Sequence, residues 1–374
     1  MSAVRMTRLA SALATLAGLV AAGTPAHAAD VPPLPVVRSV VDLGLVQQNR
    51  FVNCRDGTYS ALIKGRVFWT FNDTCLSKGG NLGDQFIDNT LSWDNTLDAR
   101  AGITLENDLK DSQGVPVRFV PFTDRELAFS ADHAPNELAI WPGHLVPDPA
   151  RNRALIFFGT VYRGSDIGFQ GVGAGIAVAS LSLKTVTRPV QNPDPDAPEP
   201  TYMWQRGERS YTGGYLLEGD MLYNYGGEGK FLSTLVHVAR VPLAQALDKS
   251  AWRYYAGNGV WSENPADSQH VYEGGAAGDT LFWSEHLGAY VTVFMPFLSN
   301  DVSARVAYRP EGPWSAPVKL FTAQQGTDTS YAARVHPAYA RNGGQVQYIT
   351  YVKNTGFLSQ ELPLVEVTLD KAAR

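Results

Sequence analysis

A single pattern of short β-type segments recurs five times along this chain of 374 residues. Each copy consists of a short apolar run, a polar turn, and a second run rich in aromatic and β-branched residues. Such a hairpin cannot bury both of its apolar faces alone, so the copies must pack against one another. The pattern therefore predicts an all-β protein built from repeated antiparallel sheets. The five copies lie at residues 60–74, 143–160, 214–227, 280–296 and 334–354.

The repeat predicts a five-bladed β-propeller with blades of up to four antiparallel strands. A third β-type run follows most copies, at residues 175–183, 234–243, 303–310 and 363–370. The segment at residues 38–51 precedes the first copy, and we expect it to complete the last blade and close the ring. Residues 29–374 would then form one domain. A β-sandwich with a second domain is the alternative, but it leaves five similar hairpins unexplained.

The first residues have the features of a secretory signal peptide. Arg5 and Arg8 precede the apolar run "LASALATLAGLVAAG", and "AHA" at residues 26–28 has the small residues of a cleavage site. We therefore expect residues 1–28 to be removed and the protein to be secreted, to the periplasm or the extracellular medium. No later stretch is long and apolar enough to predict a membrane span.

The two cysteines of the chain enclose the first hairpin, "NCRDGTYSALIKGRVFWTFNDTC", at residues 53–75. Lys64 and Gly65 form its two-residue turn, because Gly tolerates a positive φ. Counting pairs outward from this turn places Cys54 opposite Cys75, at a position where side chains approach closely. An exported protein can hold a disulfide there. Two buried free thiols are the alternative.

The same count places Asp56 opposite Asp73, beside the cysteines. In a propeller the innermost strands begin at one mouth of a central channel, and Asp56 stands at such a beginning. Two carboxylates facing each other are destabilising unless a proton, a cation or hydrogen bonds compensate, for example from Arg55. We expect such a pair to titrate as a unit with at least one raised pKa, which suits acid–base catalysis. Alternatively, both residues are ordinary turn residues, in "RDG" and "NDT".

The equivalent positions of the other blades supply further candidates, in residues 141–144, 208–214, 273–280 and 331–337. Glu208 is the candidate proton donor that would complete a catalytic set with Asp56 and Asp73, ahead of Glu273 and Glu285. Each histidine of these stretches could equally be structural, and most aromatic residues of a propeller lie in its core. The candidate substrate-binding residues are Arg55, Trp141, His144, Tyr211 and His336.

Composition excludes several other functions. The formal net charge of −5 argues against a nucleic-acid partner. The chain contains no HExxH, EF-hand, CxxC, GxSxG or P-loop motif, so we expect neither a metal nor a cofactor. The glycine-rich stretch at residues 171–177 precedes a strand, which does not fit a dinucleotide site. We expect a monomer whose partner is a polysaccharide or an oligosaccharide.

The hairpin "RDGTYSALIKGRVFWTFNDT" at residues 55–74 resembles the opening signature of the DUF4185-type secreted propellers. The stretches at residues 252–267, 287–296 and 331–337 look like later parts of the same family. Thr58 and Asn72 stand where that family usually has Gly. The resemblance implies a five-bladed propeller, and some members are glycoside hydrolases that cut furanose polysaccharides such as arabinan.

The resemblance also implies a catalytic carboxylate at the start of the first blade, which is Asp56, and two further acids on the second and third blades. Here the second blade offers only His144, and the third offers Glu208. The sequence therefore predicts a secreted glycoside hydrolase acting on an arabinan-like furanose polysaccharide. A non-catalytic carbohydrate-binding propeller, a lectin or adhesin, is the alternative. A glycosidase needs two carboxyl groups about 5 to 10 Å apart, whereas a lectin does not.

Overall fold

The computed structural model describes residues 31–80, 83, 85–105, 107–164, 168–230, 232–275 and 277–372. The described residues from Val31 onward belong to one compact unit. The predicted signal peptide lies outside the described residues. Among those that are described, no helix is both long enough and apolar enough to cross a bilayer.

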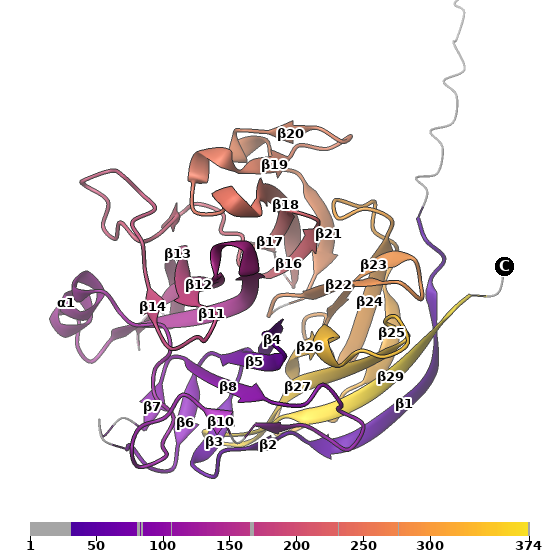
Figure 1. Cartoon of the computed structure of the whole chain (residues 1–374), viewed down its shortest axis with the longest axis horizontal. Helices are drawn as coiled ribbons and strands as arrows, with labels where there is room; N and C mark the ends of the chain where they lie inside the picture. Colours follow the sequence, from indigo (N-terminus) through magenta and orange to yellow (C-terminus); the bar gives the residue numbers. More distant parts are fainter. Residues whose placement is uncertain are drawn as a thin grey trace, which may run out of the picture. The chain divides into compact units, whose positions relative to one another are not determined.

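The structure is almost entirely β, as predicted, and five sheets of four to six strands account for most of it. Figure 1 shows these sheets following one another along the chain, from indigo to yellow. Sheet one contains β4 (Tyr59–Ile63), β5 (Arg66–Phe71), β8 (Thr90–Asp94) and β10 (Asn107–Asp108). Sheet two contains β11 (Glu137–Asp148), β12 (Arg153–Gly164), β13 (Gly168–Ser180), β14 (Val186–Thr187) and β15 (Trp204–Gln205).

The remaining three large sheets are built in the same way from the later part of the chain. Sheet three contains β16 (Gly214–Glu218), β17 (Met221–Lys230), β18 (Ser233–Pro242), β19 (Arg253–Tyr255), β20 (Trp261–Ser262) and β21 (His270–Gly274). Sheet four contains β22 (Thr280–Ser284), β23 (Ala289–Phe294), β24 (Asp301–Ala307) and β25 (Val318–Thr322). Sheet five contains β26 (Tyr331–Val335), β27 (Val346–Gly356), β28 (Ser359–Glu361), β29 (Pro363–Lys371) and β1 (Pro35–Leu45).

The first strands of the five sheets contact one another in sequence. β4 contacts β11, β11 contacts β16, β16 contacts β22, and β22 contacts β26. The 3₁₀ turn η5 (Pro337–Tyr339), which follows β26, contacts β4 and completes the circle. Five buried apolar clusters lie between successive sheets, one at each junction. The core is therefore divided into five interfaces around the first strands, and each sheet is covered on both faces.

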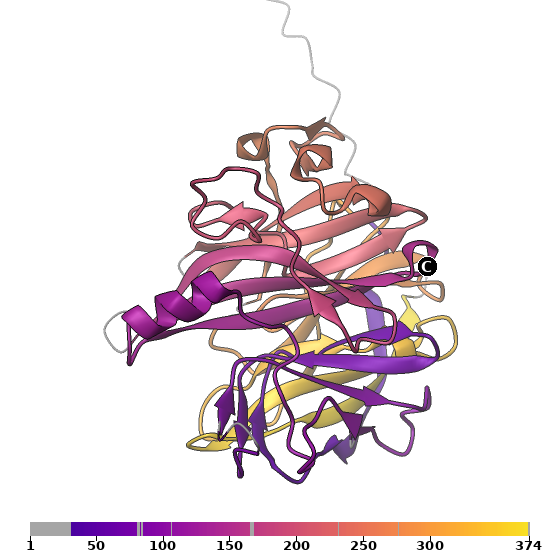
Figure 2. The ribbon, with the colours of Figure 1, turned by 60° about the vertical axis from the view of Figure 1, so that its left-hand side comes forward.

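The N-terminal strand adds to the sheet that ends the chain. β1 pairs antiparallel with β29, the last strand, so residues from the two ends of the sequence share sheet five. The strand occupies Pro35–Leu45 rather than the whole of residues 38–51. The single α-helix of the described residues, α1 (Asp124–Asp132), was missed by the sequence analysis. It begins with a capping box between Thr123 and Glu126, and Figure 2 shows it lying against the long strands of sheet two.

The first hairpin has the register counted from its turn. Ile63 pairs with Arg66, and the same register continues outward to Cys54 opposite Cys75, which form a disulfide bond. The hairpin is not continuous, however. Its outer part belongs to a small sheet of β3 (Val52–Arg55), β6 (Thr74–Leu76) and β7 (Phe86–Ile87). A further two-stranded sheet joins β2 (Gln47–Gln48) to β9 (Thr104–Leu105).

The break in the hairpin has a local cause. Gly57 and Thr58 have positive φ angles of 86° and 47°, so the backbone leaves the extended conformation directly after Asp56. A side chain at position 57 would also meet Asn72, because its Cβ would lie 2.9 Å from the Asn72 side chain. Glycine is therefore required at this position, and Asp56 stands at the corner that it creates.

Replacing Cys54 with Ser should lower the melting temperature, because the Cys54–Cys75 bond closes a loop with a sequence separation of 21 residues. A chain-entropy estimate for a loop of this length is about 3 kcal/mol. Thermal unfolding with and without reductant provides the measurement. Reductant should lower the parent's melting temperature toward that of the variant and should leave the variant unchanged. Two alkylatable thiols in the unreduced, denatured parent would contradict the assignment.

Candidate active site

Asp56 and Asp73 lie at the same end of sheet one, on either side of the hairpin break. The backbone N–H of Asn72 donates to the carbonyl of Asp56 at 2.9 Å, which joins the two segments. Asp56 Oδ2 accepts a hydrogen bond from the Tyr331 hydroxyl at 3.0 Å. Asp56 Oδ1 is buried and has no hydrogen-bond partner within the described part of the protein. Burial, and after it the charge of Asp73, raise the pKa of Asp56 to about 7.

Asp73 has a different environment from Asp56. Its Oδ1 accepts hydrogen bonds from Trp141 Nε1 at 3.0 Å and from Arg163 Nη1 at 2.8 Å. Burial raises the pKa of Asp73, whereas Arg163 and the Trp141 N–H act in the opposite direction and favour its carboxylate form. Both partners come from sheet two, from β11 and β12. Asp73 is therefore the member of the pair with cationic and N–H support for its negative charge.

Arg334 is a buried residue that links three segments of the chain close to Asp56. Its side chain is only 2% exposed, and its guanidinium lies over the Tyr59 ring at 4.4 Å. It connects β26, on which it stands, with the segments that lead into β4 and β22. Its hydrogen-bond acceptors are the carbonyl groups of Gly57 (3.2 Å), Gly278 (2.9 Å), Ala277 and Ala333 (3.1 Å), and the Tyr59 hydroxyl (3.0 Å). Gly57 follows Asp56 directly, so the clamp fixes the backbone beside this carboxyl group.

A third acid, Asp279, stands at the start of β22, next to the clamped Gly278. Its Oδ1 accepts from the Gly275 N–H at 3.1 Å, and burial raises its pKa to about 6. Its Oδ2 is buried and lacks a partner among the residues described. Asp279 lies in the predicted stretch at residues 273–280, from which Glu273 was a predicted proton donor. Glu273 is exposed and forms an ion pair with Lys230 at 3.0 Å.

Three residues expected to bind substrate are buried in structural contacts. Arg55 is fully buried, and it pairs with Asp108 at 2.8 Å and donates to Ser92 at 2.7 Å. His336 is fully buried between Ser60 and Thr350, at 2.8 Å from each. Tyr211 is also fully buried. These three side chains are therefore enclosed by contacts within the protein, as the structural alternative for His336 and the core alternative for Tyr211 predicted.

His144 is buried, with a relative exposure of 2%. It is stacked between Phe157 and Tyr215, and its Nε2 is 3.1 Å from Asn224 Nδ2. Burial lowers the pKa of His144 to about 3, so the ring is neutral. A cavity of about 380 Å³ adjoins it and is lined by residues of β4, β16 and β22, including Tyr59 and Asp279.

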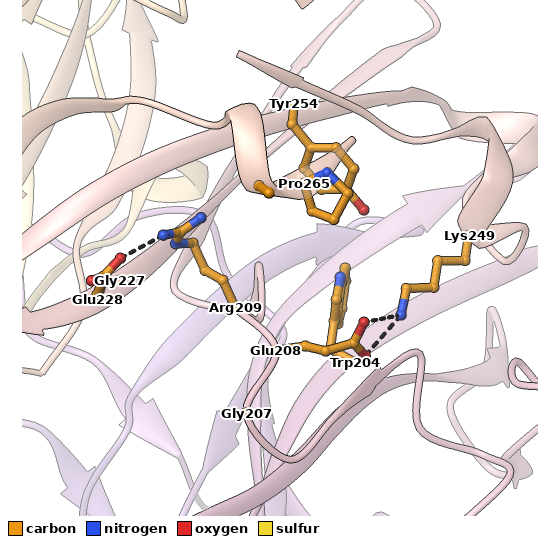
Figure 3. Close-up of a pocket in the computed structure, with 10 residues that line it drawn as sticks. Trp204, Gly207, Glu208, Arg209, Gly227, Glu228, Lys249, Tyr254 and Pro265 are labelled. Carbon is orange, nitrogen blue, oxygen red and sulfur yellow. Dashed lines mark hydrogen bonds and ion pairs between the residues drawn. The ribbon is translucent and has the colours of Figure 1, made fainter. Parts of the chain in front are cut away.

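Glu208 lies in a separate cavity of about 560 Å³, which contains none of the other acids proposed for catalysis. Figure 3 shows its carboxylate facing Lys249, with which it pairs at 2.7 Å. Arg209 and Glu228 form a second ion pair in the same cavity, and Trp204 lines its wall. The structure thus brings Asp56, Asp73 and Trp141 together, and it places Glu208 elsewhere. No group of three or more His, Cys, Asp or Glu side chains in the described ranges could hold a metal ion.

Comparison with known families shows the family to which the chain belongs. The family described as "Domain of unknown function (DUF5005)" matches residues 44–360, which is most of the chain. The chain belongs to the DUF5005 family. The resemblance to DUF4185-type propellers was therefore wrong. Its motifs describe a β-hairpin with a buried aromatic strand, and many stacked-sheet proteins require such a hairpin. No curated protein matches this DUF5005 chain.

Solved structures with a similar fold are distant in sequence. A provisionally named hydrolase from Bacteroides ovatus is 16% identical, with a TM-score of 0.56 over 84% of this chain and 86% of that chain. A family 117 glycoside hydrolase from Zobellia galactanivorans is 8% identical, with a TM-score of 0.55 over 91% and 92%. A GH43_1 enzyme from Xanthomonas citri is 13% identical, with a TM-score of 0.50 over 87% and 90%. The DUF5005 chain therefore has a fold found among glycoside hydrolases.

The raised pKa of Asp56 predicts a pH-dependent stability. Because its pKa is shifted from 3.8 to about 7, the folded protein keeps a proton that the unfolded chain loses within this range. The free energy of unfolding should then fall as pH rises through the window. Asp73 and Asp279 contribute in the same direction, so the comparison must be made with Asp56→Asn, which removes the Asp56 contribution.

Asp56→Asn should gain melting temperature over the parent at about pH 8 and little at about pH 4. Thermal unfolding of both proteins across the pH range provides the measurement. Asp196→Asn, a change in an exposed loop, is the matched control and should follow the parent. A constant difference between Asp56→Asn and the parent at all pH values would contradict the assigned pKa.

Proposed function

We propose that this protein is an exported glycoside hydrolase whose reacting groups are Asp56 and Asp73. The observation that carries the proposal is the unequal environment of two neighbouring carboxyl groups. Asp73 receives the Arg163 and Trp141 donors, whereas Asp56 is buried beside it with one oxygen unpartnered among the described residues. Environments that separate the pKa values of two neighbouring carboxyl groups are the basis of acid and carboxylate roles in glycoside hydrolysis.

In this proposal Asp56 exchanges the proton. A group with a pKa of about 7 can donate a proton to the departing glycosidic oxygen and can accept one from water near neutral pH. The Tyr331 hydroxyl fixes its orientation through Oδ2. The Arg163 and Trp141 donors favour the carboxylate form of Asp73, and in this form it would stabilise the positive charge that develops on the sugar ring or attack the ring. Asp279 is a further buried acid beside the site, and it directly follows Gly278, whose carbonyl group accepts a hydrogen bond from Arg334.

We propose further that the five large sheets are the five blades of a β-propeller. Support comes from the closed sequence of contacts between first strands and from the five apolar clusters at the junctions. Residues 1–28 would act as the signal peptide of this single-domain, monomeric protein. The Cys54–Cys75 bond suits an oxidising compartment outside the cytoplasm.

The proposed substrate is a polysaccharide, with arabinan-like furanose chains as the first class to test. The fold is shared with a family 117 glycoside hydrolase and a GH43_1 enzyme, and this supports glycosidic bond cleavage as the reaction class. A non-catalytic carbohydrate-binding protein is the second candidate. The position of Glu208 favours it, because the expected third acid lies in a separate cavity.

Asp56→Asn should abolish hydrolysis, and Asp73→Asn should reduce it by about 10² or more, the usual effect of removing an acid–base or charge-stabilising group. Both changes keep the side-chain shape. Asp56→Asn should leave the melting temperature level or higher, because it removes a buried carboxyl group with one unpartnered oxygen, whereas Asp73→Asn should lower it, because it removes the ion pair with Arg163. Glu208→Gln is the matched control and should retain turnover. The assay is the release of oligosaccharides from arabinans and other neutral polysaccharides.

Retention of turnover within a few-fold in Asp56→Asn would contradict the catalytic assignment. Loss of turnover together with a large fall in melting temperature would instead point to a structural Asp56. If the parent hydrolyses no polysaccharide and nevertheless binds one, the non-catalytic candidate replaces the proposal.

A further inference from the structure

The strands of sheet two extend well past the proposed active site. β12 and β13 have 12 and 13 residues, whereas β4 and β5 have 5 and 6. Trp141 and Arg163, the two partners of Asp73, stand on β11 and β12. Beyond Trp141, toward the ends of the long strands, Glu137 pairs with Arg163, and Arg163 pairs with Phe169 of β13. The extension therefore continues outward from Asp73.

Two aromatic rings lie on this extension. Trp141 is half-buried, and its ring centroid is 5.4 Å from that of Phe169. Phe169 is 67% exposed, which is a high value for a large apolar side chain within a strand. Trp141 also donates its N–H to Asp73, so the ring pair begins at the carboxylate.

The residue opposite Trp141 in the ladder leaves the surface open. Gly159 pairs with Trp141, and a Cβ placed at Gly159 would have no neighbour within 4 Å. The same is true of Gly171, which pairs with Val161 of β12. Glycine is unfavourable within a strand, and its use here leaves room beside the rings for a flat ligand.

The cation beside the rings, Arg163, is already paired with two carboxylates. Arg163 pairs with Asp73 at 2.8 Å and with Glu137 at 2.6 Å, and its guanidinium lies over the Phe86 ring at 4.8 Å. Its edge and one face are thus occupied, so it does not offer a free cation to an anionic ligand. A uronate or sulfated sugar would instead be repelled by the carboxylates of Asp73 and Glu137. The surface therefore suits a neutral ligand.

From these observations we infer that Trp141, Phe169 and the open surface at Gly159 form a subsite that binds neutral sugar residues of a glycan held at Asp56 and Asp73. The apolar C–H face of a sugar ring stacks on each aromatic ring, and the chain runs outward along sheet two. The inference rests on the proposed function, because it treats the Asp56–Asp73 pair as the reacting centre. It names the class of substrate as a neutral oligosaccharide or polysaccharide rather than an anionic one.

Binding is measured by titration calorimetry in the Asp56→Asn background, where no turnover is needed. The probes are neutral arabinofuranose and xylopyranose oligosaccharides, with an oligogalacturonate of matched length as the anionic probe. Phe169→Ala removes the outer ring, and Gly159→Val fills the open space opposite Trp141 and leaves both rings in the chain. Tyr308→Ala removes an exposed aromatic side chain directly after β24 of sheet four and is the matched control. Melting temperatures establish that each variant is folded.

Phe169→Ala and Gly159→Val should each weaken binding of a neutral probe by about tenfold, the loss expected when one stacked ring is removed or covered. Tyr308→Ala should bind as the parent does. Unchanged affinity in both sheet-two variants, tighter binding of the oligogalacturonate, or no binding of any neutral probe would overturn the inference. If ring-dependent binding is found but the parent, with Asp56 intact, hydrolyses no glycan, the subsite stands and the proposed hydrolase activity fails.

Discussion

The buried guanidinium of Arg334 makes the hydrogen bonds on which the arrangement of the backbone around Asp56 and Asp279 depends. A guanidinium taken out of water is costly unless its N–H groups are hydrogen-bonded, and Arg334 donates to carbonyl groups on the segments entering sheets one and four. Because it stands on sheet five, one side chain joins three sheets at one end of their first strands. Gly57 and Gly278, whose carbonyls it binds, adjoin Asp56 and Asp279. Asp56 and Asp279 are therefore both positioned next to backbone groups held by the same cation.

The two facing aspartates show how one hairpin can give two carboxyl groups different properties. Asp73 is reached by donors from sheet two, while Asp56 faces sheet five and receives only the Tyr331 hydroxyl. The left-handed backbone at Gly57 and Thr58 turns Asp56 away from the regular strand, and the Cys54–Cys75 bond lies just outside this corner. The hairpin thus holds a buried, partly unsatisfied carboxyl group beside one that is paired with an arginine. Such an arrangement is expected at a site where function outweighs local stability.

Local chemistry made the first hairpin predictable. A two-residue turn fixes a register, so Ile63–Arg66 and Cys54–Cys75 could be counted from the sequence, and the recurrence of aromatic hairpins indicated an all-β protein. The sequence could not show which polar residues are buried by distant segments. His336 and Arg55 are enclosed by residues far away in the chain, and Arg334 and Asp279 acquire their roles through contacts between different sheets. Arg334 lies in the predicted stretch "YAARVHP", an arginine among apolar residues. His336 of the same stretch was predicted to bind substrate instead. A family cannot be assigned from hairpin motifs that many β proteins require, which is why the DUF4185 resemblance failed.

The central claim is that Asp56 and Asp73 form one coupled pair in which Asp56 holds the proton. The most direct test is a ¹³C NMR titration of protein labelled at the aspartate carboxyl carbon, with Asp56→Asn used to assign the Asp56 signal. We predict a titration midpoint of about 7 for Asp56 in the parent. The midpoint should fall in Asp73→Asn, because that variant removes the negative charge that raises the pKa of Asp56. A midpoint near 3.8, the ordinary value for an aspartate, that does not change in Asp73→Asn would contradict the account.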